Sequence, residues 1–141
     1  MTKPVLLVVP FFVAVLSGCT NVAGGESRLI ASPEGGSLET GQLFSLAAAF
    51  FSEAGYQCSA DRDASRFRCS RELRDLYIHQ TRAVVEIYAG EHDSYRLVPT
   101  RWDEGLIPGE LISNTYANDD VEAFCTYIAS GKVAFCRDDE G

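Results

Sequence analysis

Apolar residues recur at helical spacing in the stretch that begins near residue 40. Ser37 or Thr40 is placed to cap the N-terminus of this helix. Gly55 stands where helices commonly end on a left-handed residue. The pattern predicts a helix that contacts the core through Leu43, Leu46, Ala47, Phe50, Phe51 and Ala54.

A second helix is indicated near the C-terminus. Asp119 and Glu122 have the spacing of a capping box, and Gly131 marks the expected end. Each predicted helix leads into a short segment that carries a cysteine, residues 56–58 and 133–136, and we expect both segments to be strands. The apolar positions of the second helix are Val121, Phe124, Cys125 and Ile128.

The residues between the two helices have mostly the pattern of β-strands. A polar turn between Cys58 and Cys69 predicts a hairpin clamped by a disulfide. Residues 83–88 and 95–98 predict a second hairpin, because the turn between them is rich in glycine and polar residues.

Two segments in this region are harder to assign. Residues 71–82 fit a helix or a strand, and we expect a strand from about Ile78. Residues 99–117 are expected to form a long loop, which packs through Trp102, Leu106, Ile107 and Leu111. Together the elements predict an α+β fold in a single domain over residues 38–141, with a small antiparallel sheet of about four to five strands and two helices packed on it.

The N-terminus has the features of an export signal. Lys3 precedes an apolar run of 12 residues, 5–16, that contains Pro10. As a helix this run is about 18 Å long, whereas the hydrocarbon core of a bilayer is ~30 Å thick. It is therefore expected to insert only transiently, as a signal peptide over residues 1–18.

The run Leu16-Ser17-Gly18-Cys19 resembles the lipobox of bacterial lipoproteins. The resemblance implies that Cys19 receives a diacylglyceryl group and becomes the first residue after cleavage, so that the membrane is a partner through the lipidated Cys19. Thr20 stands where an aspartate would favour retention in the inner membrane, so a Gram-negative lipoprotein of this kind would go to the outer membrane and face the periplasm. The alternatives are an ordinary secretory signal with an incidental Cys19, or a buried N-terminal strand.

The residues after Cys19 have the composition of a linker. Residues 19–37 contain two Gly-Gly pairs and a single apolar pair, Leu29-Ile30, so we expect a flexible tether.

Four cysteines remain for the exported domain, an even number that suits an oxidising compartment. Local pairing is the simplest of three connectivities, and it predicts two disulfides. A zinc site with four thiolates is the alternative, but zinc ligands are usually spaced much more closely. Eleven positions separate the members of each pair, Cys58 with Cys69 and Cys125 with Cys136.

The chain is acidic, with a formal charge of −8, or −9 after loss of Lys3 with the signal. This charge argues against a nucleic-acid partner. Arginines concentrate in residues 62–82, whereas residues 103–122 carry six acids and no base. These segments are either solvated faces or a docking surface of complementary charge. The candidate residues of a partner surface are Trp102, Asp119, Asp120, Arg66 and Arg68.

The sequence offers little catalytic chemistry. His79 and His92 are the two histidines, and neither belongs to a recognisable nucleophile or metal motif. His92-Asp93 beside Glu91 could hold a cation weakly, but solvated turn polarity is the simpler interpretation. We expect no catalytic residue, no metal and no cofactor.

Four functions remain open. The first is a non-enzymatic envelope lipoprotein that binds or assembles with an envelope protein partner. The others are a periplasmic inhibitor or immunity protein that uses acids of residues 103–122 against a hydrolase, a cell-wall-acting enzyme, and a carrier of a small ligand or metal.

Overall fold

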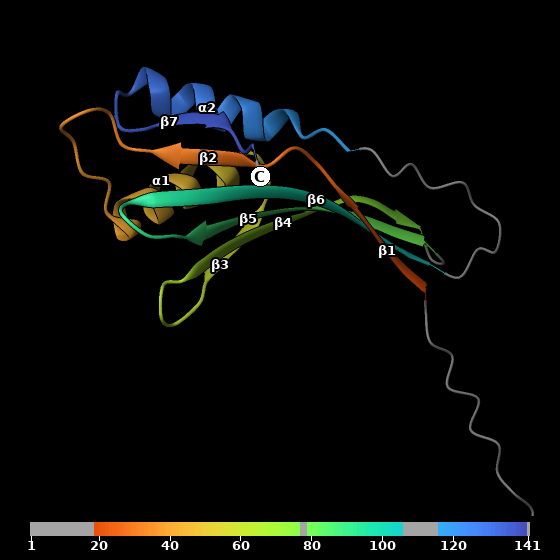
Figure 1. Ribbon diagram of the computed structural model, residues 1–141. Coiled ribbons are helices and arrows are strands. Elements are labelled where there is room, and N and C mark those ends of the chain that lie inside the picture. Colours follow the sequence, from red (N-terminus) through yellow and green to blue (C-terminus); the bar gives the residue numbers. More distant parts are fainter. Residues whose placement is uncertain (1–18, 77–78, 106–115, 141) are drawn as a thin grey trace, which may run out of the picture.

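The computed structural model describes residues 19–76, 79–105 and 116–140. It shows two helices on one face of a seven-stranded antiparallel sheet (Figure 1). The α+β prediction is confirmed, and the sheet is larger than the predicted four to five strands. The helices are α1 (Thr40–Glu53) and α2 (Asp119–Ser130), and the strands are β1 (Cys19–Gly24), β2 (Arg28–Ala31), β3 (Gln57–Ala60), β4 (Arg66–Leu76), β5 (His79–Ala89), β6 (Ser94–Gly105) and β7 (Phe135–Asp138).

The predicted tether contains two strands. The strand order is β3-β4-β5-β6-β2-β7, and β1 also pairs with β6. The expectation of a flexible segment over residues 19–37 is therefore wrong for β1 and β2. Although the composition of this segment is that of a linker, two of its residues are buried against the sheet, Ala23 at 2% exposure and Ile30 at 0%.

The gap between β1 and β2 has a local cause. Pro99 lies opposite it on β6 and has no N–H to donate to a neighbouring strand. The chain crosses this point through Gly25, whose N–H donates to the Pro99 carbonyl at 2.9 Å. A Cβ on Gly25 would lie 2.9 Å from the Tyr116 carbonyl oxygen. Glycine is therefore required where these backbones meet.

Alternation along the strands places one set of side chains under the helices. Phe67 on β4 stacks on Phe44 of α1 with ring centroids 5.3 Å apart. Phe51 of α1 and Phe124 of α2 lie 5.1 Å apart and are both fully buried. The two helices and the sheet thus share one core.

Described parts of both regions with an ambiguous pattern belong to the sheet: residues 71–76 and 79–82 of the first, and residues 99–105 of the second. Residues 71–76 continue β4, and its pairing with β5 shifts register between Glu72 and Arg74. This bulge disturbs the alternation of side chains, which explains why the stretch resembled a helix. The long loop predicted over residues 99–117 is wrong for residues 99–105, which belong to β6. The expected packing of Leu106, Ile107 and Leu111 lies outside the described residues.

The helix ends differ from the predicted caps. Neither Ser37 nor Thr40 caps α1, and the Thr40 hydroxyl instead lies 3.2 Å from the Tyr95 hydroxyl. Gly55 has φ +86°, as expected for a residue that ends a helix. The cap of α2 is Asn118, whose side chain accepts from the Asp120 N–H at 3.0 Å, and not Asp119.

Both predicted disulfides are present. Cys58 and Cys69 lie directly opposite one another on β3 and β4. Cys125 and Cys136 join α2 to β7, with their Cα atoms 5.5 Å apart. The second bond holds a strand of four residues whose one partner in the sheet is β2.

Removal of either disulfide should lower the free energy of unfolding by roughly 3 kcal/mol, because the two closed loops are small and equal in length. Urea denaturation of the C58A/C69A and C125A/C136A variants measures this loss. In the second variant alone, amide exchange should also accelerate in β7, since that strand loses its link to α2. A loss well below 1 kcal/mol in both variants would contradict the prediction.

Candidate functional site

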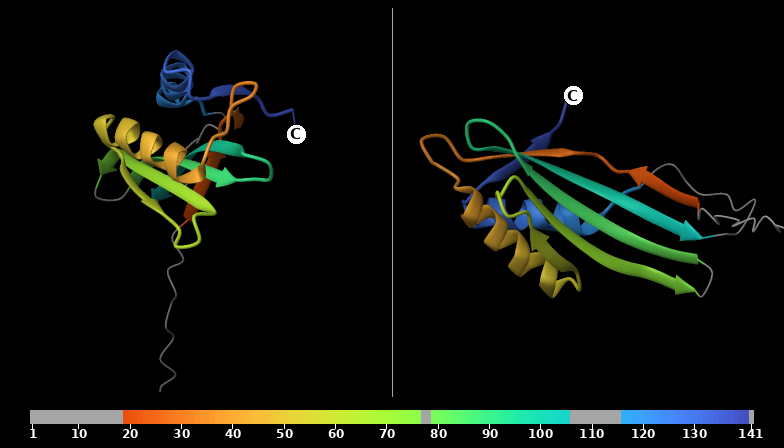
Figure 2. Two further views of the ribbon diagram at one scale, coloured as in Figure 1. Left: turned by 90° about the vertical axis from the view of Figure 1, so that its left-hand side faces the viewer. Right: turned by 90° about the horizontal axis from the view of Figure 1, so that it is seen from below.

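The helices leave one face of the sheet uncovered (Figure 2). We call this the open face; it consists of the residues of β1, β2 and β4 to β7 that alternate with those under the helices. Three of the predicted surface residues, Arg66, Arg68 and Trp102, lie on it. Its aromatic and apolar side chains are Val22, Leu29, Val84, Tyr88, Val98, Trp102 and Phe135.

The open face carries a contact between Arg68 and Trp102. The Arg68 guanidinium carbon lies 5.3 Å from the centre of the Trp102 ring, in cation–π geometry. The two side chains come from β4 and β6, so the stack crosses β5. It crosses at Val84, which is fully buried although neither α1 nor α2 covers that face. The indole N–H donates to the Thr100 hydroxyl at 3.0 Å, which fixes the ring.

Charge on the open face differs from charge on the whole chain. The described side chains of the open face include five arginines and three glutamates, whereas the whole chain has a formal net charge of −8. Three of these arginines have carboxylate partners: Arg66 with Asp61 and Glu86, Arg82 with Glu72 and Glu104, and Arg96 with Asp139.

Arg68 differs from these three arginines. Within the described part of the chain it has no carboxylate within ion-pair distance, although Glu86 lies opposite it on β5. A guanidinium over an indole ring can still donate its outer N–H groups to a carboxylate.

A groove lies between the stack and the β5–β6 hairpin. It has a volume of about 530 Å³, and its lining includes Leu29, Tyr88, Arg96 and Val98. Val98, which lines the groove, and Arg68 flank the same β5 residue, Glu86.

The other two predicted surface residues lie in the opposite layer. Asp119 and Asp120 begin α2, and Asp120 is committed to contacts inside the fold. It accepts from the Tyr56 hydroxyl at 2.9 Å and pairs with Arg71 Nη2 at 2.9 Å. The predicted surface is therefore split between two faces.

Arg71, which the sequence analysis did not single out, organises this cluster. Its Nη1 donates to the Ala54 carbonyl at the end of α1 at 2.7 Å, and its guanidinium lies 4.6 Å from the centre of the Tyr56 ring. One side chain from β4 thereby joins the end of α1 to the start of α2. The clue in the sequence is that Arg71 lies two residues after Cys69, on the same strand.

The acidic segment predicted for an inhibitor also has internal partners. Asp103 is 5% exposed and lies 3.0 Å from Arg101 Nε and 2.9 Å from the Thr81 hydroxyl. Asp120, Glu104 and Glu122 also pair with arginines of this chain, so four of the six acids in residues 103–122 have ion-pair partners within the fold.

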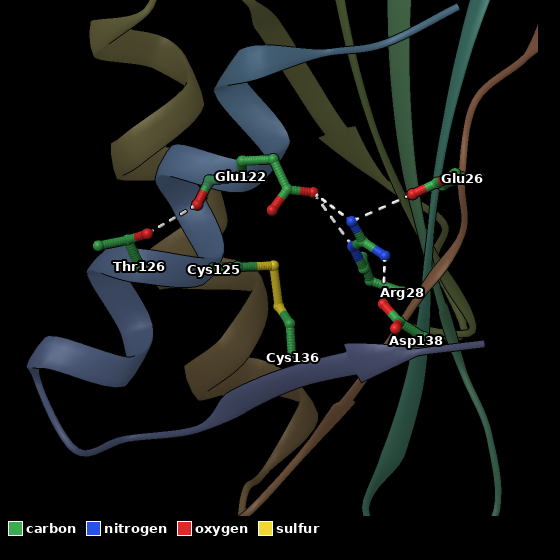
Figure 3. Close-up of a disulfide and its surroundings, with 7 residues drawn as sticks. All are labelled: Glu26, Arg28, Glu122, Cys125, Thr126, Cys136 and Asp138. Carbon is green, nitrogen blue, oxygen red and sulfur yellow. Dashed lines mark hydrogen bonds and ion pairs between the residues drawn. A yellow bond between two sulfur atoms is a disulfide. The ribbon is translucent and has the colours of Figure 1, made fainter.

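An ion-pair cluster lies beside the second disulfide (Figure 3). Arg28 on β2 bonds Glu122 of α2 at 2.7 Å and also contacts Glu26 and Asp138. The hydrogen bond to Glu122 raises the pKa of Arg28 above its ordinary value. Together with the Cys125–Cys136 bond, the cluster fastens α2 to β2 and β7, which is a structural role.

Catalytic and metal chemistry have few candidates here. His92 lies in the turn between β5 and β6 with φ +55°, and the side chain of His79 lies outside the described residues. Within the described ranges, no group of three or more His, Cys, Asp or Glu side chains is arranged to hold a metal ion. Neither α1 nor α2 is long and apolar enough to cross a bilayer. Cys19 is the first residue of β1.

No protein-family model matches this chain, and no curated protein matches it either.

The Tyr56 cluster makes stability sensitive to high pH. Burial raises the pKa of Tyr56 to about 12; the Asn118 amide, which donates to the hydroxyl at 3.1 Å, lowers it, and the bond to Asp120 raises it. As pH rises above ~10 the unfolded chain loses this proton while the folded chain keeps it, so the fold loses stability. Between about pH 10 and about pH 12, the stability advantage of wild type over Tyr56→Phe should fall by roughly 2 kcal/mol.

Urea denaturation at several pH values measures this fall. Tyr127→Phe, at a position 46% exposed, is the matched control and should follow wild type. An unchanged difference between wild type and Tyr56→Phe across this range would show that the phenol is not protected in the fold.

Proposed function

We propose that this protein is a lipid-anchored lipoprotein of the bacterial envelope that binds a partner protein through its open face. The observation that carries the binding role is the Arg68–Trp102 stack, on the sheet face that α1 and α2 leave uncovered. Arginine and tryptophan are the residues that most often supply binding energy at the centre of protein interfaces.

The anchor is supported by the N-terminal sequence. A basic residue, a short apolar run and the lipobox at Leu16-Ser17-Gly18-Cys19 follow one another in the order of a lipoprotein signal. The two disulfides fit an oxidising compartment such as the periplasm. Thr20 supports delivery to the outer membrane.

The chemistry of the open face favours one kind of partner. Arg68 is available for a carboxylate, and the adjacent groove offers Leu29, Val98 and Tyr88 to apolar side chains. The partner we propose is a protein that presents acidic residues beside apolar ones. The three glutamates of the open face and the acidic charge of the chain disfavour an anionic lipid surface there.

The role is one of binding rather than catalysis. The sequence contains no recognisable nucleophile or phosphate-binding motif, and the stacked pair is suited to recognition.

Lipidation can be tested on the full chain in its native host. Mass spectrometry of the membrane-bound protein should find an N-terminal peptide that begins at Cys19 and carries acyl chains. Cys19→Ala should lose the lipid and leave the membrane fraction. The control, Ser17→Ala, keeps a small residue before the cleavage site and should remain lipidated. A wild-type protein that starts at Met1 would contradict the anchor.

Partner binding can be tested with photo-crosslinkers at two exposed tyrosines. Tyr88 is 37% exposed on the open face, and Tyr127 is 46% exposed on α2. A crosslinker at 88 should repeatedly capture one envelope protein that a crosslinker at 127 does not capture. Arg68→Glu should weaken that complex about 30-fold, since loss of a central interface arginine costs on the order of 2 kcal/mol.

Arg62→Glu makes the same charge change in the β3–β4 turn and should leave the complex intact. With the partner purified, the association rate should fall as salt rises, because the contact is electrostatic. Equal capture from both tyrosines, or a complex indifferent to Arg68→Glu, would contradict the proposed binding face.

A further inference from the structure

The anchored cysteine has no spacer between it and the sheet. β1 pairs with β6 from Cys19 opposite Gly105 to Gly24 opposite Thr100. β2 then continues along the same edge of β6 and ends with Ala31 opposite Ser94. Residues 19–31 therefore follow β6 over its whole length, with the Gly25 bond to Pro99 bridging the gap.

This pairing places Cys19 at one extreme end of the sheet. Gly105, opposite Cys19, is also opposite His79 at the start of β5, and His79 is opposite Leu76 at the end of β4. The hairpin between β5 and β6, residues 90–93, lies at the other end. Eleven steps along β6 separate the two ends, a length of roughly 37 Å in an extended strand.

The helices lie toward the hairpin end. β4, β5 and β6 extend beyond α1 and α2 on the side where β1 begins (Figure 1; Figure 2). β1 is held in place by burial as well as by pairing, because Ala23 is 2% exposed and Gly25 fits closely against Pro99. The Cys19 end of β1 is joined to the sheet by its pairing with β6.

We infer that the domain stands end-on at the membrane, with the Cys19 end of the sheet against the lipid surface and the β5–β6 hairpin farthest from it. This inference rests on the proposed lipidation of Cys19. The acyl chains must enter the bilayer, and a paired β1 leaves no flexible residues between them and the sheet.

The orientation locates the binding surface. Trp102 lies three steps along β6 from Gly105, about 10 Å from the anchored end. Arg68 stacks on it, so this part of the proposed binding surface lies close to the bilayer, whereas the groove lined by Tyr88 and Arg96 lies toward the hairpin end. The partner must accordingly present its acidic segment next to the membrane, as an integral or anchored protein does.

Trp102 is the single tryptophan of the chain and serves as the reporter. The full-length acylated protein is placed in phosphatidylcholine vesicles that contain a lipid with a nitroxide on its headgroup. Trp102 fluorescence should be strongly quenched. A W102F/E91W variant moves the reporter to the exposed hairpin and should be quenched several-fold less.

A third variant separates Cys19 from the sheet by a flexible spacer. Ten Gly and Ser residues inserted between Thr20 and Asn21 keep the lipobox and Thr20 but add a spacer. Quenching of Trp102 should fall toward the value for the hairpin reporter.

Equal quenching of the two reporters in the acylated protein, as a flexible or side-on domain would give, overturns the inference but leaves the anchor intact. Quenching of Trp102 unchanged by the inserted spacer overturns it in the same way. If mass spectrometry finds Cys19 without lipid, both the anchor and the orientation are overturned.

Discussion

Much of the rest of the structure depends on the pairing of residues 19–31 with β6. It adds a strand to the edge of β6, buries Ala23 and Ile30, and gives β7 a strand on which to pair. β7 in turn holds α2 through the Cys125–Cys136 bond. A segment with the composition of a linker is therefore part of the framework, and its first residue is the one that resembles a lipidation site.

The second constraint is that the helices cover one face of the sheet. On the covered face, Arg71 joins α1 to α2 through Ala54 and Asp120. On the open face, Arg68 rests on Trp102 and has no carboxylate within ion-pair distance among the described residues. This contact is the reason we propose a partner that presents carboxylates.

The sequence predicted the elements whose signals are local. The apolar spacing and Gly55 located α1, and equal cysteine spacing located both disulfides. It did not predict β1 and β2, because a short strand is recognised by a partner that lies about 70 residues away in the chain. The sequence singled out both Trp102 and Arg68 as candidates. It did not reveal the register of the strands, which brings these two residues together and leaves Asp119 in another layer.

Amide hydrogen exchange across residues 20–37 tests the central claim most directly. The account predicts strong protection of β2, which is paired on both sides, protection of the Gly25 amide, and intermediate protection of β1, which lies at an edge. Residues 34–37, which precede α1 and are exposed, should exchange quickly. Exchange of residues 20–25 at the rate of an unfolded peptide would show that the anchor leads into a free tether, and it would contradict the account.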